Sequence, residues 1–204
     1  MKRNYIYLCM ALSLIACLST PALAQTAEEW YDRGYDCTFD GDYEGAVECY
    51  TKSIEADPSY VYAYDSRGLA HANLGQYDKA IADFTKAIEI DPEYQAPYSN
   101  LAFAYYRMGD FENALESFTV ALEMDPAGTS YNARADVYRE LGRYDEAIAD
   151  IEEAMILVPN DPRWMYTRGL IYRDMGDTDR AKADLEHACT EGVPEACAAL
   201  EDVM

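Results

Sequence analysis

The chain has 204 residues, of which 50% are hydrophobic, and a formal net charge of −22. All 38 acidic residues follow Ala24, whereas Lys2 and Arg3 precede it, so residues 25–204 carry 14 − 38 = −24. A surface this negative repels phosphate backbones and anionic lipid. The composition therefore argues against a nucleic-acid partner and favours either a simply solvated surface or a cationic partner.

The first 24 residues have the three parts of a secretory signal peptide. Lys2 and Arg3 precede an apolar run over residues 5–18, and Ala-Leu-Ala before Gln25 is a good signal-peptidase site. An alternative is acylation of Cys17, because residues 14–17 resemble a lipoprotein box. The largely apolar residues 18–24 favour cleavage over a polar lipoprotein tether. In both cases the sequence predicts export, with a periplasmic or secreted location or, through Cys17, an envelope lipoprotein.

After the leader, one unit of about 34 residues is repeated five times, at residues 27–60, 61–94, 95–127, 128–161 and 162–193. Each unit has glycine at its position 15, which ends a first helix, and proline at or just after position 32, which ends a second. Positions 8, 20 and 27 always hold Gly, Ala or Ser, so the two helices can approach closely. The pattern predicts five helical hairpins that must stack to bury their apolar faces.

The unit resembles the tetratricopeptide repeat, a helix–turn–helix motif. The resemblance covers nearly all of the chain after the leader. It implies an all-α fold, a right-handed α/α superhelical solenoid of five hairpins, with a C-terminal capping helix expected at residues 194–204. It also implies a protein–protein interaction module. In the second unit its marks are Tyr64, Gly68, His71, Gly75, Tyr77, Ala80, Phe84, Ala87 and Pro92.

In proteins with this repeat, unit positions 2, 5, 9, 12 and 13 of each first helix line a concave groove. The spacing places most of them on one helical face. Tyrosine there suits peptide recognition, because it combines a large contact area with a polar tip. The alternative is that tyrosine simply fills the surfaces of a tyrosine-rich chain. The expected binding residues are Tyr31, Tyr35, Tyr62, Leu69, Asn73, Phe103, Tyr106, Asn132, Asp136, Arg139, Tyr166, Leu170 and Arg173.

Some members of the family capture chaperone C-termini with Lys and Asn at positions 5 and 9 of the first repeat. Tyr31 and Tyr35 stand in those positions here. The resemblance therefore implies a groove that does not bind a carboxylate tail in that way.

Arginine and aspartate recur at unit positions 7 and 23, equally far from the glycine turn. In an antiparallel hairpin these positions face one another, so we expect partly buried ion pairs that fix the hairpin register. The third unit has Leu101 and Ser117 instead, and the first has Arg33 opposite Cys49. The predicted pairs are Arg67 with Asp83, Arg134 with Asp150, and Arg168 with Asp184.

Four cysteines follow the leader. Cys189 and Cys197 lie symmetrically about a helix break at residues 192–194, so they should face each other. Their segment also resembles disulfide-linked α/α repeats, and we expect a disulfide that pins the C-terminal helix. For Cys37 and Cys49 an axial offset of about 6 Å favours two separate core residues, with a second disulfide as the alternative.

Residue sets typical of enzymes or metal sites do not stand out. His71 occupies a core position that tyrosine fills in later units, and His187 is solitary. Residues 40–45 imitate the start of a calcium loop, but Thr51 stands where the bidentate carboxylate is needed. The sequence thus predicts a protein or peptide partner, no catalysis, no cofactor and no metal. Membrane contact is expected only if Cys17 is lipidated, as in the alternative of an envelope-assembly scaffold subunit.

Overall fold

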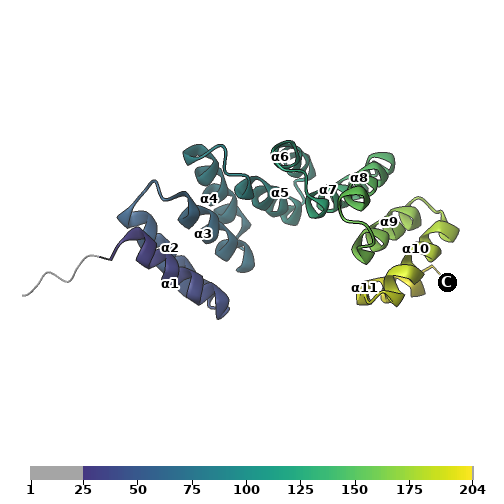
Figure 1. Cartoon of the computed structure of the whole chain (residues 1–204), viewed down its shortest axis with the longest axis horizontal. Helices are drawn as coiled ribbons and strands as arrows, with labels where there is room; N and C mark the ends of the chain where they lie inside the picture. The colour runs from purple at the N-terminus through teal and green to yellow at the C-terminus, as the bar shows by residue number, and fades with distance from the viewer. Residues whose placement is uncertain (1–24, 204) are drawn as a thin grey trace, which may run out of the picture.

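The computed structural model describes residues 25–203, and the expected signal peptide at residues 1–24 lies outside this range. Within the range the chain forms eleven α-helices and no strand, arranged as five antiparallel hairpins and one short final helix. Figure 1 shows them along an arch with α1 and α11 at its ends. The helices are α1 (Ala27–Phe39), α2 (Tyr43–Ala56), α3 (Val61–Asn73), α4 (Tyr77–Ile90), α5 (Ala96–Met108), α6 (Phe111–Met124), α7 (Gly128–Glu140), α8 (Tyr144–Leu157), α9 (Pro162–Asp174), α10 (Thr178–Thr190) and α11 (Pro194–Glu201).

Each hairpin turns at a glycine with a positive φ. Gly41, with φ 79°, adopts a left-handed conformation that residues with a Cβ rarely take. The next residue, Asp42, caps α2 because its carboxylate accepts a hydrogen bond from the Gly45 amide at 3.0 Å. The residues that resemble a calcium loop therefore form a helix cap.

Small residues let the two helices of a hairpin approach closely. A Cβ added to Gly68 would lie 2.6 Å from the Phe84 ring, closer than real Cβ contacts. Ala80 and Ala87 are fully buried in the same hairpin. Unit position 24 holds a buried large side chain in every hairpin, and the core cluster around each one also includes a residue of the next hairpin or of α11. These side chains are Tyr50, Phe84, Phe118, Ile151 and Leu185.

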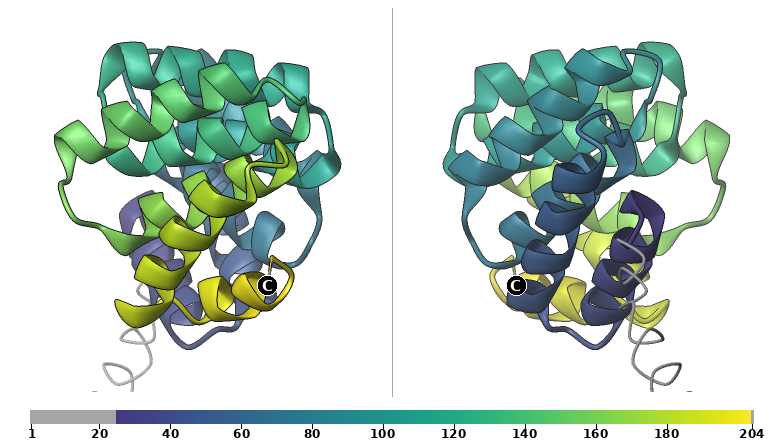
Figure 2. Two further views of the ribbon diagram at one scale, coloured as in Figure 1. Left: turned by 90° about the vertical axis from the view of Figure 1, so that its right-hand side faces the viewer. Right: turned by 90° about the vertical axis from the view of Figure 1, so that its left-hand side faces the viewer.

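The first helices of the hairpins form the inner side of the arch. Each first helix contacts the next one, α1 with α3 and so on to α9, whereas in the described range no two second helices are in contact. The first helices are therefore closer together, and a stack built this way must curve toward them. Figure 1 shows α3, α5, α7 and α9 on the inside, and Figure 2, which views the arch from each end, places the middle hairpins above both ends.

The predicted ion pairs are confirmed in all three hairpins. Arg67, Arg134 and Arg168 each donate through Nε and Nη2 to both carboxylate oxygens of the aspartate opposite, over distances of 2.7 to 2.9 Å. Two parallel hydrogen bonds to one carboxylate define orientation as well as distance. The pairs therefore hold the register of the two helices.

The C-terminal helix α11 covers the end of the last hairpin. Ala196 and Ala199 pack against Leu185 and Ala188, so the apolar face of the last repeat is not left open. The Cys189 and Cys197 sulfurs lie at disulfide distance, with their Cα atoms 4.8 Å apart. Among residues 25–203, no helix is long and apolar enough to cross a membrane.

Candidate functional site

A row of tyrosines crosses the inner side of the first two hairpins. The rings of Tyr31, Tyr60, Tyr62 and Tyr94 follow one another with centroid separations of 5.5, 5.7 and 5.4 Å, each pair edge to face. This geometry stabilises aromatic pairs beyond the area that they bury. Tyr62 is 49% exposed, so the row presents a preformed aromatic surface to solvent.

Tyr60 and Tyr94 were missed in the groove expected from the sequence. Both are the last residue of their unit, position 34, which precedes the next first helix and is not among the groove positions. The recurrence of tyrosine at the ends of units 1 and 2 was the available signal. The structure shows that these linker residues bridge tyrosines of the first helices.

Asp65 is a buried carboxylate beneath this tyrosine row, and it too was missed, although it occupies position 5 of its unit. It is 5% exposed and accepts hydrogen bonds from the Tyr94 hydroxyl at 3.1 Å and from Asn100 Nδ2 at 2.8 Å. Burial raises the pKa of Asp65, and these two hydrogen bonds partly oppose that shift. The carboxylate thereby orients Tyr94 and connects α3 to α5.

A recess of about 510 Å³ continues the surface between α3 and α5. Leu69, Asn73 and Phe103, all expected in the groove, lie in its wall. Phe103 is 47% exposed and its ring lies 6.5 Å from that of Tyr106. The Arg107 guanidinium lies 5.8 Å from the Phe103 ring centroid, within cation–π range. The recess thus offers an apolar wall with a cation at its edge.

A polar cluster occupies the inner side of the fourth and fifth hairpins. Arg139 donates from Nη1 to Asp174 and from Nη2 to Glu140, both at 2.7 Å. Its Nε lies 3.7 Å from Asp136 Oδ1, too far for a hydrogen bond. This Nε and Asn132 Oδ1 are buried without a partner. Such atoms are uncommon in folded proteins, so they mark polar capacity that a ligand could use.

The carboxyl of Asp136 is the titratable centre of this cluster. Desolvation raises its pKa to about 6, against the lowering effect of Arg139, while 30% of its side chain stays exposed. Burial also raises the pKa of Tyr106 and of Tyr166, and the charge of Asp136 adds to both shifts. Tyr106, Asp136 and Tyr166 belong to three successive repeats, and their linked pKa shifts show that they share one electrostatic environment.

Not all of the expected residues join this surface. Tyr35 is 60% exposed and makes no ring contact with another aromatic residue of the described range. Leu170 is 8% exposed and packs in the core under α11. Arg173, by contrast, adjoins the polar cluster, because it donates at 3.0 Å to Asp174, the carboxylate that Arg139 also binds. The name inner groove is used below for Tyr31, Tyr60, Tyr62, Leu69, Asn73, Tyr94, Phe103, Tyr106, Asn132, Asp136, Arg139 and Tyr166.

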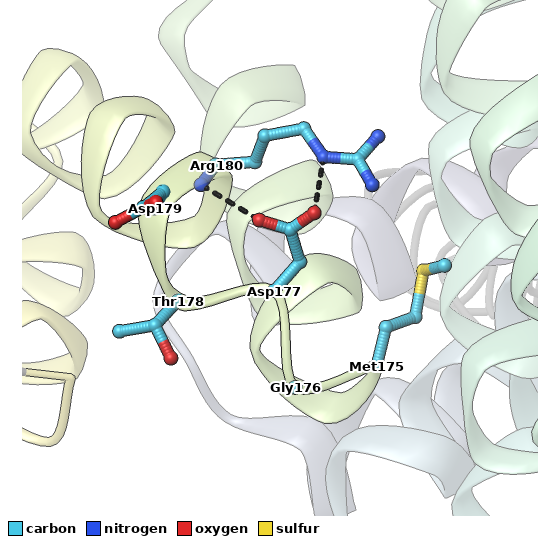
Figure 3. Close-up of a pocket in the computed structure, with 6 residues that line it drawn as sticks. All are labelled: Met175, Gly176, Asp177, Thr178, Asp179 and Arg180. Atoms are coloured by element: carbon cyan, nitrogen blue, oxygen red, sulfur yellow. Dashed lines mark hydrogen bonds and ion pairs between the residues drawn. The ribbon is translucent and has the colours of Figure 1, made fainter.

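Another recess of about 510 Å³ surrounds the turn of the fifth hairpin, at residues 175–180 (Figure 3). The Asp177 carboxylate caps α10 by accepting a hydrogen bond from the Arg180 amide at 3.1 Å. It also accepts one from Arg180 Nε at 2.6 Å. Because these polar groups already satisfy one another, this recess offers a ligand less than the inner groove does.

The histidine and the two cysteines near the N-terminal end serve packing. His71 is buried as predicted, with Nδ1 3.0 Å from Gln76 Oε1, and burial lowers its pKa. Cys37 and Cys49 are half-buried free thiols, but they lie near one another rather than apart, since Cys49 also contributes to the raised pKa of Cys37. Burial raises the pKa of Cys37. Among residues 25–203, no three His, Cys, Asp or Glu residues are placed to share a metal ion.

Fold and surface together define an all-α repeat superhelix that presents an aromatic and polar inner groove. Family models described as TPR repeat match residues 34–75 and 72–109, and others described as tetratricopeptide repeat match residues 100–162 and 163–190. The chain belongs to the tetratricopeptide-repeat family. No curated protein sequence matches it.

Solved structures agree with this family. A thermophilic TPR protein of Thermus thermophilus, TTC0263, is 20% identical with a TM-score of 0.69, over 87% of this chain and 98% of that one. YrrB, described as a TPR protein with an unusual peptide-binding site, is 20% identical with a TM-score of 0.70, over 86% and 92%. The first TPR of Spaghetti (RPAP3), bound to the HSP90 peptide SRMEEVD, is 25% identical with a TM-score of 0.57, over 58% and 95%.

Proposed function

We propose that this chain is an exported protein–protein interaction module that binds a peptide segment or a partner helix in its inner groove. The observation that carries the proposal is the continuity of the groove. Aromatic, apolar and polar side chains from five successive first helices and from two linkers line this inner side. An extended peptide or a helix can contact several repeats along such a surface at once.

The physical character of the groove supports peptide binding. Tyr62, Leu69 and Phe103 are 49%, 39% and 47% exposed, although each stands beside other groove residues. Clustered, exposed apolar side chains typically mark interaction sites. Tyrosine loses little entropy on binding and is common among residues that dominate binding energy. The peptide-bound Spaghetti structure and the peptide-binding site described for YrrB lend further support.

Export rests on the sequence of residues 1–24, which lie outside the described range. Cleavage before Gln25 would release the domain into the periplasm or out of the cell. The alternative, a lipid-anchored scaffold subunit of an envelope assembly, requires acylation at Cys17. The intact mass of the mature protein separates the two, because a chain that begins at Gln25 cannot carry that anchor.

The groove is tested by capture of partners from an envelope extract. The variant Tyr62→Ala/Phe103→Ala/Tyr106→Ala removes three groove side chains. A matched control, Met124→Ala/Ile156→Ala/Met175→Ala, removes three exposed apolar side chains outside the groove, which are 38%, 70% and 39% exposed. We expect the wild type and the control to retain a partner that the groove variant loses, with equal helicity by circular dichroism. Retention by all three proteins would place binding on another face.

The proposal includes no catalytic activity. Tetratricopeptide-repeat proteins generally act as non-catalytic scaffolds. His71, the histidine in the core, is only 7% exposed.

A further inference from the structure

On the outer side of the arch, a similar set of side chains surrounds an arginine in several hairpins. In the fourth hairpin Arg134 bonds to Asp150 and also donates from Nη1 to the Thr119 hydroxyl of the preceding hairpin, at 3.1 Å. Its guanidinium carbon lies 5.7 Å from the ring centroids of both Tyr131 and Tyr138. We call these surroundings, two tyrosines, a threonine and an aspartate, the arginine cradle.

The second hairpin repeats most of the cradle, and the fifth repeats its aspartate and one tyrosine. Arg67 donates to Asp83 and, at 3.1 Å, to Thr51 of the preceding hairpin, and it lies 5.7 Å from the Tyr64 ring. Arg168 pairs with its aspartate and lies 5.9 Å from the Tyr172 ring. An aromatic face is thus a partner of the guanidinium in all three hairpins, and a threonine hydroxyl is one in two of them, since Arg168 Nη1 instead lies 3.7 Å from Met155 Sδ.

The third hairpin keeps the walls of the cradle without its arginine. Tyr98 and Tyr105 stand at the same unit positions as Tyr131 and Tyr138, and Thr85 stands at the position of Thr119. The arginine is replaced by Leu101, and Ser117 replaces the aspartate. These residues line a recess of about 330 Å³ between α4, α5 and α6, with Glu116 also in its wall. Leucine is shorter than arginine and uncharged, so it leaves space between the rings.

We propose that this recess binds an arginine side chain supplied by a protein partner. Tyr98 and Tyr105 would face the guanidinium as their equivalents do in the fourth hairpin, and the Thr85 hydroxyl would accept a hydrogen bond from it. Glu116 lies in the recess wall and supplies the negative charge that Ser117 does not. The net charge of −22 attracts cationic segments to the whole surface.

The chemistry favours arginine over other side chains. Lysine lacks the planar guanidinium that packs on aromatic faces and donates in several directions at once. A leucine would leave the Thr85 and Ser117 hydroxyls facing an apolar group, with no hydrogen bond from it. The recess is on the outer side of the arch, so this inference is independent of the inner groove.

The direct test is a titration of the ¹⁵N-labelled domain, residues 25–204, with N-acetyl-arginine amide, followed by NMR. N-acetyl-lysine amide and N-acetyl-leucine amide serve as comparison probes. We expect saturable shifts at residues 98–105 and 113–120 with the arginine probe, with a Kd on the order of millimolar for so small a ligand. Absence of these shifts, or equal binding of the leucine or lysine probe, would overturn the proposal.

Two variants locate the site. Leu101→Arg/Ser117→Asp rebuilds the pair of the neighbouring hairpins, so the chain fills its own cradle and binding of the probe should be lost. Glu116→Gln leaves the recess open and should weaken binding about threefold, since only one solvent-accessible charge is removed. The groove variant Tyr62→Ala/Phe103→Ala/Tyr106→Ala should bind the probe as wild type does. Unchanged binding in both cradle variants would refute the site even if the groove proposal holds.

Discussion

Arg134 and Asp150 lie sixteen residues apart in sequence and meet through two hydrogen bonds of 2.8 Å across the fourth hairpin. Their side chains are only 15% and 8% exposed. The carboxylate and the guanidinium have lost most of their hydration and are stabilised by each other instead. Neither can lose its partner without leaving a largely buried charge unpaired.

Removal of one partner should therefore be costly. We expect Asp150→Ala to lower the free energy of unfolding by about 3 kcal/mol, because Arg134 keeps its charge without a counterion. The double variant Arg134→Leu/Asp150→Ser copies the third hairpin and should cost only about 1 kcal/mol, since no charge stays behind. Urea unfolding followed by circular dichroism measures both. A double variant less stable than the single one would contradict this account.

Asp136 should make stability depend on pH. Its pKa is raised from 3.8 to about 6 on folding, so the folded state favours the protonated carboxyl. Wild type therefore loses stability relative to a neutral isostere as pH rises from about 4 to 6. We expect Asp136→Asn to be more stable than wild type by about 1–2 kcal/mol at pH 7, a value reduced for partial exposure. At pH 4 wild type and Asp136→Asn should have equal free energies of unfolding.

Urea midpoints at pH 7 and pH 4 provide this test. Arg139 keeps Asp174 and Glu140 as partners in the variant, so the substitution leaves no cation unpaired. Glu153→Gln, on the exposed side of α8, is the matched control and should shift neither midpoint. A destabilised Asp136→Asn at pH 7 would mean that the ion pair with Arg139 outweighs desolvation.

His71 should produce a dependence on pH of the opposite sign. Burial lowers its pKa below 6.5, so the folded state favours the neutral imidazole. Stability from this residue is complete above pH 6.5 and is lost as pH falls through the lower, folded-state pKa. We expect His71→Tyr, which copies the third to fifth hairpins, to be less sensitive to acid below pH 6.5. Thermal unfolding of wild type and His71→Tyr at pH 7 and pH 5 tests this. If the melting temperature of both proteins changes equally between the two pH values, His71 is not a source of the acid sensitivity.

The Cys189–Cys197 contact predicts a disulfide that holds α11. Peptide mapping under non-reducing conditions should find the two linked, and Cys197→Ser should increase hydrogen exchange over residues 194–201. In the chain-entropy model, a disulfide that closes so short a loop stabilises the folded state by about 2.5 kcal/mol. Cys37→Ser/Cys49→Ser, which changes the two free thiols, should leave exchange in α11 unaltered. Two free thiols at 189 and 197 in the purified protein would refute the bond.

Only some of the residues in and around the inner groove could be predicted from the sequence. Tyr62, Leu69 and Phe103 were expected from the family resemblance, and the structure places Tyr62 in the tyrosine row and Leu69 and Phe103 in the wall of one recess. Asp65 does not, because its partners Tyr94 and Asn100 stand 29 and 35 residues away, at the end of its own unit and in the next. Leu170 shares the helical position of Leu69 but is covered at the C-terminal end of the stack.

The sequence by itself determined the hairpins, their glycine turns and the ion pairs across them. Those features depend on contacts within one unit, where small residues and symmetry about the turn define which positions meet. Only the tertiary structure decided which side chains share the inner groove, and that the cradle residues of the third hairpin line an open recess where the neighbouring hairpins hold an arginine. Those features depend on how successive units stack and curve, and no periodicity within a single unit encodes that rotation.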